Sequence, residues 1–303
     1  MDIREEKGNI YIDKVIDFNI EQTLECGQCF HFERLDNMEY AVIAYGRLLH
    51  IKQEKDTLIL YGKTKAEAEN IWIPYFDLER DYGKIKSTLL KKDEKLKEAI
   101  TEKYGVRILN QEFYETLISF IISQNKQIPH IKKIVFALSD TYGEPIGEIG
   151  GKTYYSFPTL ERLGEVTEDN YRELKTGFRA PYLKCASDML NSTLKEKEIR
   201  ELSYDAAKEM LMQIKGVGEK VANCVLLFGL SHRNAFPVDV WIKRTMEAVY
   251  FDGADTSKEK IMEFARDRFG EYGGYAQQYL FFYGRDGGIG VTSKAKGQVG
   301  ENK

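Results

Sequence analysis

The sequence predicts an α+β protein with two domains. An N-terminal antiparallel β-sheet domain with helices spans 1–110, and a mostly helical domain spans 111–285. Closely spaced segments rich in aromatic and branched residues fill 9–61 and indicate strands. From residue 65 onward, apolar residues recur at helical spacing. We predict that the glycine-rich tail, 286–303, is disordered because it has almost no apolar periodicity.

Composition limits the possible functions. The chain has 303 residues, of which 43% are hydrophobic, and a formal net charge of −4. This charge argues against generic, charge-driven binding of nucleic acid, so any DNA contact has to come from local basic surface. No run approaches twenty apolar residues, and the N-terminus has no apolar signal segment. We therefore expect a soluble intracellular protein, in the cytoplasm or nucleoid, without a membrane partner.

Five strands are expected in the N-terminal domain, arranged as an antiparallel meander because turn residues separate them closely. They are 9–13, 30–35, 40–45, 48–53 and 57–61. Three segments with helical periodicity follow within the same domain, at 65–76, 84–90 and 93–104.

The helical domain is predicted from apolar stripes and from residues that begin helices. A buried helix is expected at 111–123, and Pro129 is typical of the first position of the next helix. Further helices are expected at 203–214, after Asp239 to about 250, at 257–269 and at 275–283.

Four cysteines occur, and two of them form a C-x-x-C motif, Cys26 and Cys29. Such a motif invites a redox or zinc interpretation. However, no second close pair exists, and the chain has only four histidines. We therefore predict that the protein holds no metal.

The segment 213–244 is the most informative stretch of the chain. Gly216 and Gly218 lie between two apolar helical stripes and permit positive backbone φ angles, so the turn is expected to be very tight. Free N–H groups and the helix dipole at the start of the second helix favour an anion. This pattern predicts a helix-hairpin-helix that grips a phosphate.

Two side chains in this segment indicate chemistry beyond phosphate binding. Lys220 falls in the first turn of the second helix, with Cys224 four residues later on the same face. Asp239 is typical of a helix N-cap, a position that favours the ionised carboxylate. A lysine amine near an ionised aspartate suits attack on a carbon that carries developing positive charge. Taken singly, the two residues are better explained as a solvent-facing lysine and an ordinary capping aspartate, but together with the glycine hairpin they favour chemistry.

The sequences GVGEK at 216–220, VANC at 221–224 and PVDV at 237–240 resemble the core of the helix-hairpin-helix DNA glycosylases. The most similar branch is the 8-oxoguanine DNA glycosylase/AP lyase family, and the resemblance extends over about 23–283. It implies a multifunctional base excision repair enzyme that excises 8-oxoguanine from damaged double-stranded DNA, as a monomer without a cofactor. It also implies that Lys220 forms a Schiff base that proceeds to β-elimination, while Asp239 stabilises the sugar.

The same resemblance implies four residues that bind the damaged base. The base would lie between Cys224 and Phe281, with Gln277 and Gly27 reading its edges. Glycine suits close approach of the backbone to a ligand. Without the resemblance, Phe281 is equally well explained as core and Gln277 as a surface amide.

Further residues are expected to contact DNA. By resemblance, Asn125 fills the space left by the extruded base, Phe178 inserts into the base stack, and Arg179 contacts the orphaned base. Without it, a turn amide, a core phenylalanine and a surface arginine are the alternatives. His130 replaces a second arginine of cytosine-specific relatives, which predicts weaker preference for cytosine. Lysines are expected to supply local positive surface, at 126, 132, 133, 175 and 184.

Two other functions remain open from the sequence. One is a non-catalytic helix-hairpin-helix DNA-binding protein. The other is a glycosylase of the same superfamily that acts on another damaged or mismatched base. Lys220 argues against monofunctional glycosylases, and the lack of four clustered cysteines after residue 230 argues against the iron–sulfur branch.

Overall fold

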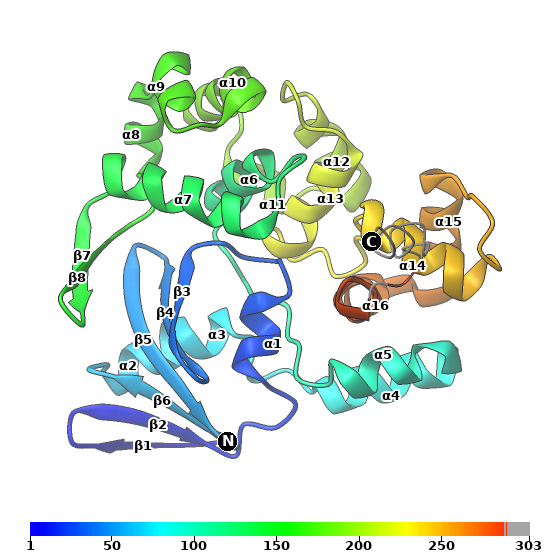
Figure 1. The fold of residues 1–303 in the computed structure, drawn as a ribbon, viewed down its shortest axis with the longest axis horizontal. Coiled ribbons are helices and arrows are strands. Elements are labelled where there is room, and N and C mark those ends of the chain that lie inside the picture. Colours follow the sequence, from blue (N-terminus) through cyan, green and yellow to red (C-terminus); the bar gives the residue numbers. More distant parts are fainter. Residues whose placement is uncertain (288, 290–303) are drawn as a thin grey trace, which may run out of the picture.

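A six-stranded antiparallel sheet lies beside a larger body of helices in the computed structural model, which describes residues 1–287 and 289 (Figure 1). The strand order is β1-β2-β6-β5-β4-β3. The strands are β1 (Asp2–Glu6), β2 (Asn9–Asp13), β3 (Phe32–Asp36), β4 (Glu39–Ala44), β5 (Arg47–Glu54) and β6 (Thr57–Tyr61).

All five predicted strands are present, but the predicted single meander is wrong. β3 to β6 do form a meander, whereas β2 pairs with β6 instead of β3. The helix α1 (Ile20–Glu25) separates β2 from β3 in the chain, so the two strands are not joined by a tight turn. β1 was not predicted, because its residues are mostly charged and exposed and show no apolar alternation.

Two large sets of buried side chains hold the chain together. The first joins the sheet to α1, to a π-helix (Ala68–Trp72) and to α3 (Ile73–Tyr75), which follow the short helix α2 (Lys65–Glu67) that has no buried residue. The second fills the helical body and includes side chains from α4 (Tyr82–Lys92) and α5 (Lys97–Glu102). By packing, α4 and α5 therefore belong with the helices, although the predicted boundary at 110 assigns them to the N-terminal domain.

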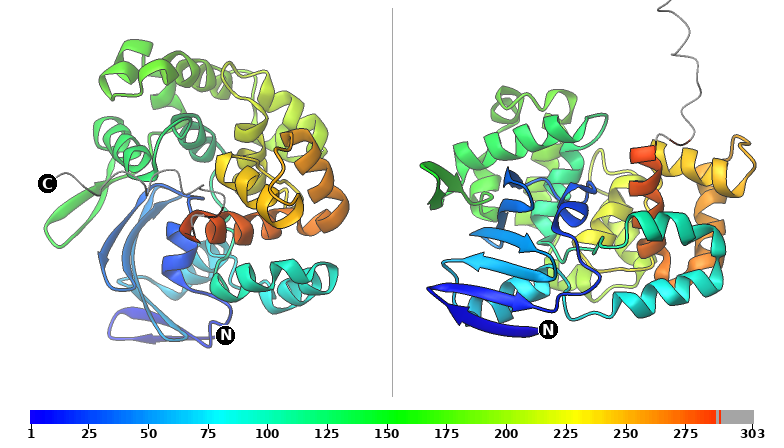
Figure 2. Two further views of the ribbon diagram at one scale, coloured as in Figure 1. Left: turned by 45° about the vertical axis from the view of Figure 1, so that its right-hand side comes forward. Right: turned by 60° about the horizontal axis from the view of Figure 1, so that its bottom comes forward.

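The helical body contains α6 (Phe113–Ile122) and α13 (Glu219–Phe228) as its most buried helices. The remaining helices are α7 (Ile128–Tyr142), α8 (Leu160–Glu165), α9 (Glu168–Glu173), α10 (Ala180–Asn191), α11 (Glu196–Arg200), α12 (Tyr204–Met212), α14 (Val240–Tyr250), α15 (Lys258–Phe269) and α16 (Gly273–Gly287). The two views of Figure 2 show α16 between α14 and the pair α4–α5.

Several elements of the helical part differ from the prediction. α8, α9 and α11 are too short to show helical periodicity, and small residues interrupt the apolar stripe of α10. The hairpin of β7 (Pro145–Ile149) and β8 (Lys152–Tyr155) is largely exposed and therefore lacks a strand signal. The predicted disordered tail, 286–303, lies outside the described residues except for 286, 287 and 289, and α16 includes the first two. No helix within 1–287 is long and apolar enough to span a bilayer.

Candidate active site

The turn between α12 and α13 is the tight hairpin that the sequence predicts. Gly216 has φ +83°, and a Cβ at this position would lie 2.3 Å from the ring of Tyr182. Gly218 caps α13 with φ −95° and ψ 179°, which is an ordinary extended conformation. Only the first glycine therefore requires positive φ, and Gly218 instead leaves open space, with no atom within 4 Å of its Cβ position.

A cleft of about 570 Å³ lies in front of this hairpin. Five of the predicted site residues line it, namely Asn125, Phe178, Gly218, Lys220 and Asp239. They come from four separate places in the chain: the turn before α7, the turn before α10, the start of α13 and the start of α14. The structure therefore brings together residues that the sequence separates by more than one hundred positions.

Lys220 and Asp239 both face this cleft and both are half-buried. The amine of Lys220 lies 5.1 Å from the ring centroid of Phe120. Asp239 is the N-cap of α14, as predicted, and its Oδ1 accepts a hydrogen bond of 2.8 Å from the backbone N–H of Ile242. This bond orients the carboxylate at the mouth of the cleft.

Cys224 lies one turn beyond Lys220 on α13 and is buried. Burial raises the pKa of its thiol to about 11, and the nearby Lys220 opposes part of that shift. The thiol is therefore neutral at cellular pH and offers an apolar contact surface rather than a nucleophile.

Gly27 and Phe281 lie against one another, although 254 positions of sequence separate them. Gly27 has φ +85°, and a Cβ there would lie 3.4 Å from Cε1 of Phe281. Gln277 is buried one turn earlier on α16, so it is not the surface amide of the alternative explanation. Its Nε2 donates to the carbonyl of Pro237, 3.2 Å away, and its Oε1 accepts from Gln278. α16 is thus bonded directly to the segment that leads into Asp239.

Arg179 is not the surface arginine of the alternative explanation, and its contact with an orphaned base stays a prediction. It is only 4% exposed, and its Nε donates to the carbonyl of Gln124 at 2.8 Å. A second nitrogen donates to the carbonyl of Thr176 at 3.0 Å. Arg179 therefore joins its own turn to the turn that carries Asn125.

Phe178, Asn125 and His130, also predicted to contact DNA, are exposed. Phe178 is 51% exposed, so the core alternative is wrong, and its ring stacks over the guanidinium of Arg179 at 4.2 Å. Asn125 is exposed at the tip of its turn with φ +50°, and His130 is exposed in the first turn of α7. The DNA-binding roles of these residues stay predictions.

Sequence reasoning missed several residues of the cleft wall. Val240, which is 58% exposed, and Trp241 follow Asp239, and Lys258 and Met262 approach from α15. The available signal in the sequence was the apolar pair Val240-Trp241 directly after the helix cap. Such a pair is also typical of an amphipathic helix, and only the structure shows that Val240 is exposed.

The two cysteines of the C-x-x-C motif are buried free thiols. Burial raises the pKa of Cys26 to about 12. Across residues 1–287, no three His, Cys, Asp or Glu side chains are grouped so that they could hold a metal ion.

Comparison with known proteins identifies the family. Residues 10–117 match the family described as 8-oxoguanine DNA glycosylase, N-terminal domain, and residues 118–271 match the HhH-GPD superfamily of base excision DNA repair proteins. The chain therefore belongs to the 8-oxoguanine DNA glycosylase/lyase family within the HhH-GPD superfamily. This membership favours an enzyme over a non-catalytic DNA-binding protein.

Individual relatives support the same assignment to this family. A probable N-glycosylase/DNA lyase of Methanothermobacter thermautotrophicus is 31% identical over 74% of this chain and 76% of its own length. The N-glycosylase/DNA lyase OGG1 of Arabidopsis thaliana is 30% identical over 86% of this chain and 75% of its own. The crystal structure of the Clostridium acetobutylicum 8-oxoguanine glycosylase/lyase, bound to double-stranded DNA with cytosine opposite 8-oxoguanine, is 40% identical with a TM-score of 0.91. The match covers 95% of this chain and 99% of that one.

The hairpin glycines give a prediction about stability. Gly216→Ala should lower the free energy of unfolding by about 1–3 kcal/mol, because the methyl group is strained at positive φ and collides with Tyr182. Gly218→Ala is the matched control and should cost less than about 1 kcal/mol, since its Cβ would enter open space. Urea denaturation of the three proteins measures both effects, and equal losses would contradict this description of the hairpin.

Proposed function

We propose that this protein is a bifunctional DNA glycosylase/AP lyase that excises 8-oxoguanine from duplex DNA, with Lys220 as the nucleophile. The observation that carries the proposal is one cleft lined by both the amine of Lys220 and the carboxylate of Asp239. The backbone N–H of Ile242 holds that carboxylate in place. Two exposed turns suited to DNA border the same cleft. Family membership supplies the class of lesion.

The chemistry follows from these groups. The nitrogen lone pair of Lys220 attacks C1′ while the bond from C1′ to the base breaks, and the base leaves with the bonding electron pair. One of the two amine protons neutralises the departing base, and the other passes to O4′ as the sugar ring opens, which leaves a C1′=N Schiff base. Removal of a C2′ proton then expels the 3′ phosphate by β-elimination. The ionised carboxylate of Asp239 stabilises the positive charge that develops on the sugar.

Recognition requires the damaged base to leave the stack, which costs a few kcal/mol. Phe178 is exposed and suited to enter the vacated stack, and Asn125 lies on the facing turn of the cleft. The extruded base would then lie between the neutral thiol of Cys224 and the ring of Phe281. Oxidation converts N7 of guanine into a donor, which a carbonyl at Gly27 would accept. We also propose that the enzyme acts as a monomer inside the cell, since one chain supplies every one of these groups.

Lys220→Gln should abolish excision and borohydride cross-linking while damage-specific binding persists, because the amide cannot form a Schiff base. Lys258→Gln is the matched control, since it removes a positive charge from the same cleft without removing the proposed nucleophile. Single-turnover excision, binding and cross-linking are measured for each. Efficient cross-linking by Lys220→Gln would place the nucleophile elsewhere.

Asp239→Asn should preserve the fold, because asparagine also caps helices and can accept from the N–H of Ile242. Excision should nevertheless slow by about 100-fold or more, since the charge opposite the developing positive sugar is lost. Thermal unfolding is measured beside single-turnover rates. Rates equal to those of the wild type would remove Asp239 from the mechanism.

His130 leads to a prediction about the base opposite the lesion. Histidine is shorter than arginine and mostly neutral at cellular pH, whereas arginine offers a charged fork of donors to the acceptor edge of cytosine. His130→Arg should therefore raise the preference for cytosine, by about 1–3 kcal/mol if a full contact is gained. Excision is compared opposite C, A, G and T. A wild type that is already strictly cytosine-specific, and unchanged by the arginine, would refute this role of His130.

A further inference from the structure

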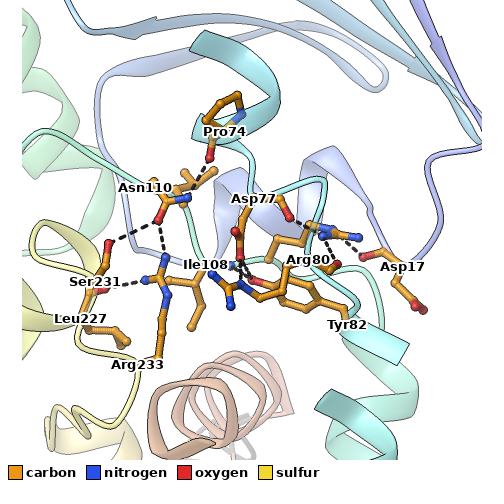
Figure 3. Close-up of polar contacts among 12 residues, drawn as sticks. Asp17, Pro74, Asp77, Arg80, Tyr82, Ile108, Asn110, Leu227, Ser231 and Arg233 are labelled. Carbon is orange, nitrogen blue, oxygen red and sulfur yellow. Dashed lines mark hydrogen bonds and ion pairs between the residues drawn. The ribbon is translucent and has the colours of Figure 1, made fainter. Parts of the chain in front are cut away.

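Residues 107–111, between α5 and α6, run along the junction between the sheet and the helical body. Figure 3 shows Asn110 between Pro74 on one side and Ser231 and Arg233 on the other. Its Nδ2 donates to the carbonyl of Pro74 at 2.7 Å, and its backbone N–H donates to the carbonyl of Tyr75 at 2.9 Å. Its Oδ1 accepts from the guanidinium of Arg233. One side chain thus joins α3 of the sheet core to the segment before α14.

Residues 107–111 also form hydrogen bonds to the loop that carries Gly27. The side chain of Gln28 is fully buried, and its Nε2 donates to the carbonyl of Arg107 at 2.7 Å. Its Oε1 accepts from the backbone N–H of Leu109 at 2.9 Å. The carbonyl of Gln28 in turn accepts from Nε2 of Gln111 at 2.8 Å. Both the side chain and the main chain of the residue after Gly27 are therefore fixed to 107–111.

Hydrogen bonds also connect residues 107–111 to α13, which carries Lys220, and through Arg233 to α16. The backbone N–H of Gln111 donates to the carbonyl of Phe228, the last residue of α13, at 3.1 Å. Arg233, which Asn110 holds, donates to the carbonyl of Leu227 on the same helix at 2.7 Å. The carbonyl of Arg233 accepts from the N–H of Gly274 at the start of α16. Residues 107–111 thus connect the Gly27 loop with α13 and α16.

We propose that Gln28, Asn110 and Gln111 are positioning residues, which fix the position of the Gly27 loop relative to α13 and α16. The inference rests on the proposed function. Gly27 follows α1, which packs in the sheet core, while Cys26 and Phe30 on either side of it pack in the helical core that contains the helix of Lys220. A hydrogen bond to the base requires placement within about 0.5 Å, and apolar packing, which is non-directional, does not by itself fix a loop that closely. The amides of Gln28, Asn110 and Gln111 supply directional hydrogen bonds across the junction.

This role affects only the step that involves the base. At a pre-formed abasic site no base is present, so strand cleavage there requires Lys220 but not the Gly27 loop. Loosening the connection should therefore separate the two activities of one enzyme. A general loss of stability would lower both activities together.

Gln111→Glu tests the proposal. The change keeps the shape of the side chain and the backbone N–H bond to Phe228, but it turns a carboxylate oxygen toward the carbonyl of Gln28. Single-turnover excision of 8-oxoguanine should fall about tenfold or more, equivalent to about 1.4 kcal/mol. Cleavage of abasic DNA should stay within about twofold of wild type, because no base contact contributes to it. Gln111→Met, which removes the donor without adding charge, provides the same comparison if the glutamate variant does not fold.

Gln22→Met is the matched control. Gln22 also connects α1 to the helical side, donating to the carbonyl of Glu102 and accepting from the N–H of Gly105, both at 2.9 Å. It lies five residues before Gly27, at the other end of α1, so the ratio of excision to abasic cleavage should not change. Equal losses of both activities in Gln111→Glu, or undiminished excision, would overturn the proposal. A wild type that cleaves neither substrate would instead refute the proposed function itself.

Discussion

Burial of α13 is the interaction on which the rest of the structure depends. Every residue from Val221 to Phe228 is buried, and the ring of Phe228 stacks on Phe120 of α6 with centroids 5.5 Å apart. Burying such side chains stabilises the fold by about 1.5–3 kcal/mol each. Only the first turn of α13 emerges from this packing, and it carries Lys220 into the cleft. The apolar contacts that stabilise the helical body therefore also fix the position of the proposed nucleophile.

The loop that carries Gly27 and the helix that carries Lys220 meet where the two cores join, which sets a second constraint. Gly27 follows α1 of the sheet core, whereas Cys26 and Phe30 beside it pack in the helical core, and Gly27 itself lies against Phe281 of the last helix. The overall charge of −4 gives no general attraction to DNA. Three lysines, Lys126, Lys220 and Lys258, line one cleft together with the carboxylates of Glu219 and Asp239, so any attraction to DNA there is local. Under the proposed function, specificity for a lesion depends on how accurately the two cores are joined, more than on the strength of DNA binding.

Much of this arrangement could be predicted from the sequence because the signals are local. Strand alternation located β2 to β6, and the glycine hairpin and the cap at Asp239 predicted the start of α13 and of α14. The pairing of β2 with β6 depends on contacts across 45 or more positions, which a local pattern does not contain. The burial of Arg179 depends on carbonyls of Gln124 and Thr176 that only the folded turns bring together. The role of 107–111 was invisible for the same reason, since its amides look like those of any polar linker.

The most direct test of the account is to identify the residue that becomes attached to DNA. The wild-type enzyme is incubated with duplex DNA containing 8-oxoguanine opposite cytosine, the adduct is reduced with borohydride, and the digested protein is sequenced by mass spectrometry. The account predicts that the deoxyribose remnant is found on the peptide containing Lys220, at that side chain. Attachment at Lys258, at Lys126 or at the N-terminal amine would contradict the assignment of the cleft and the mechanism built on it.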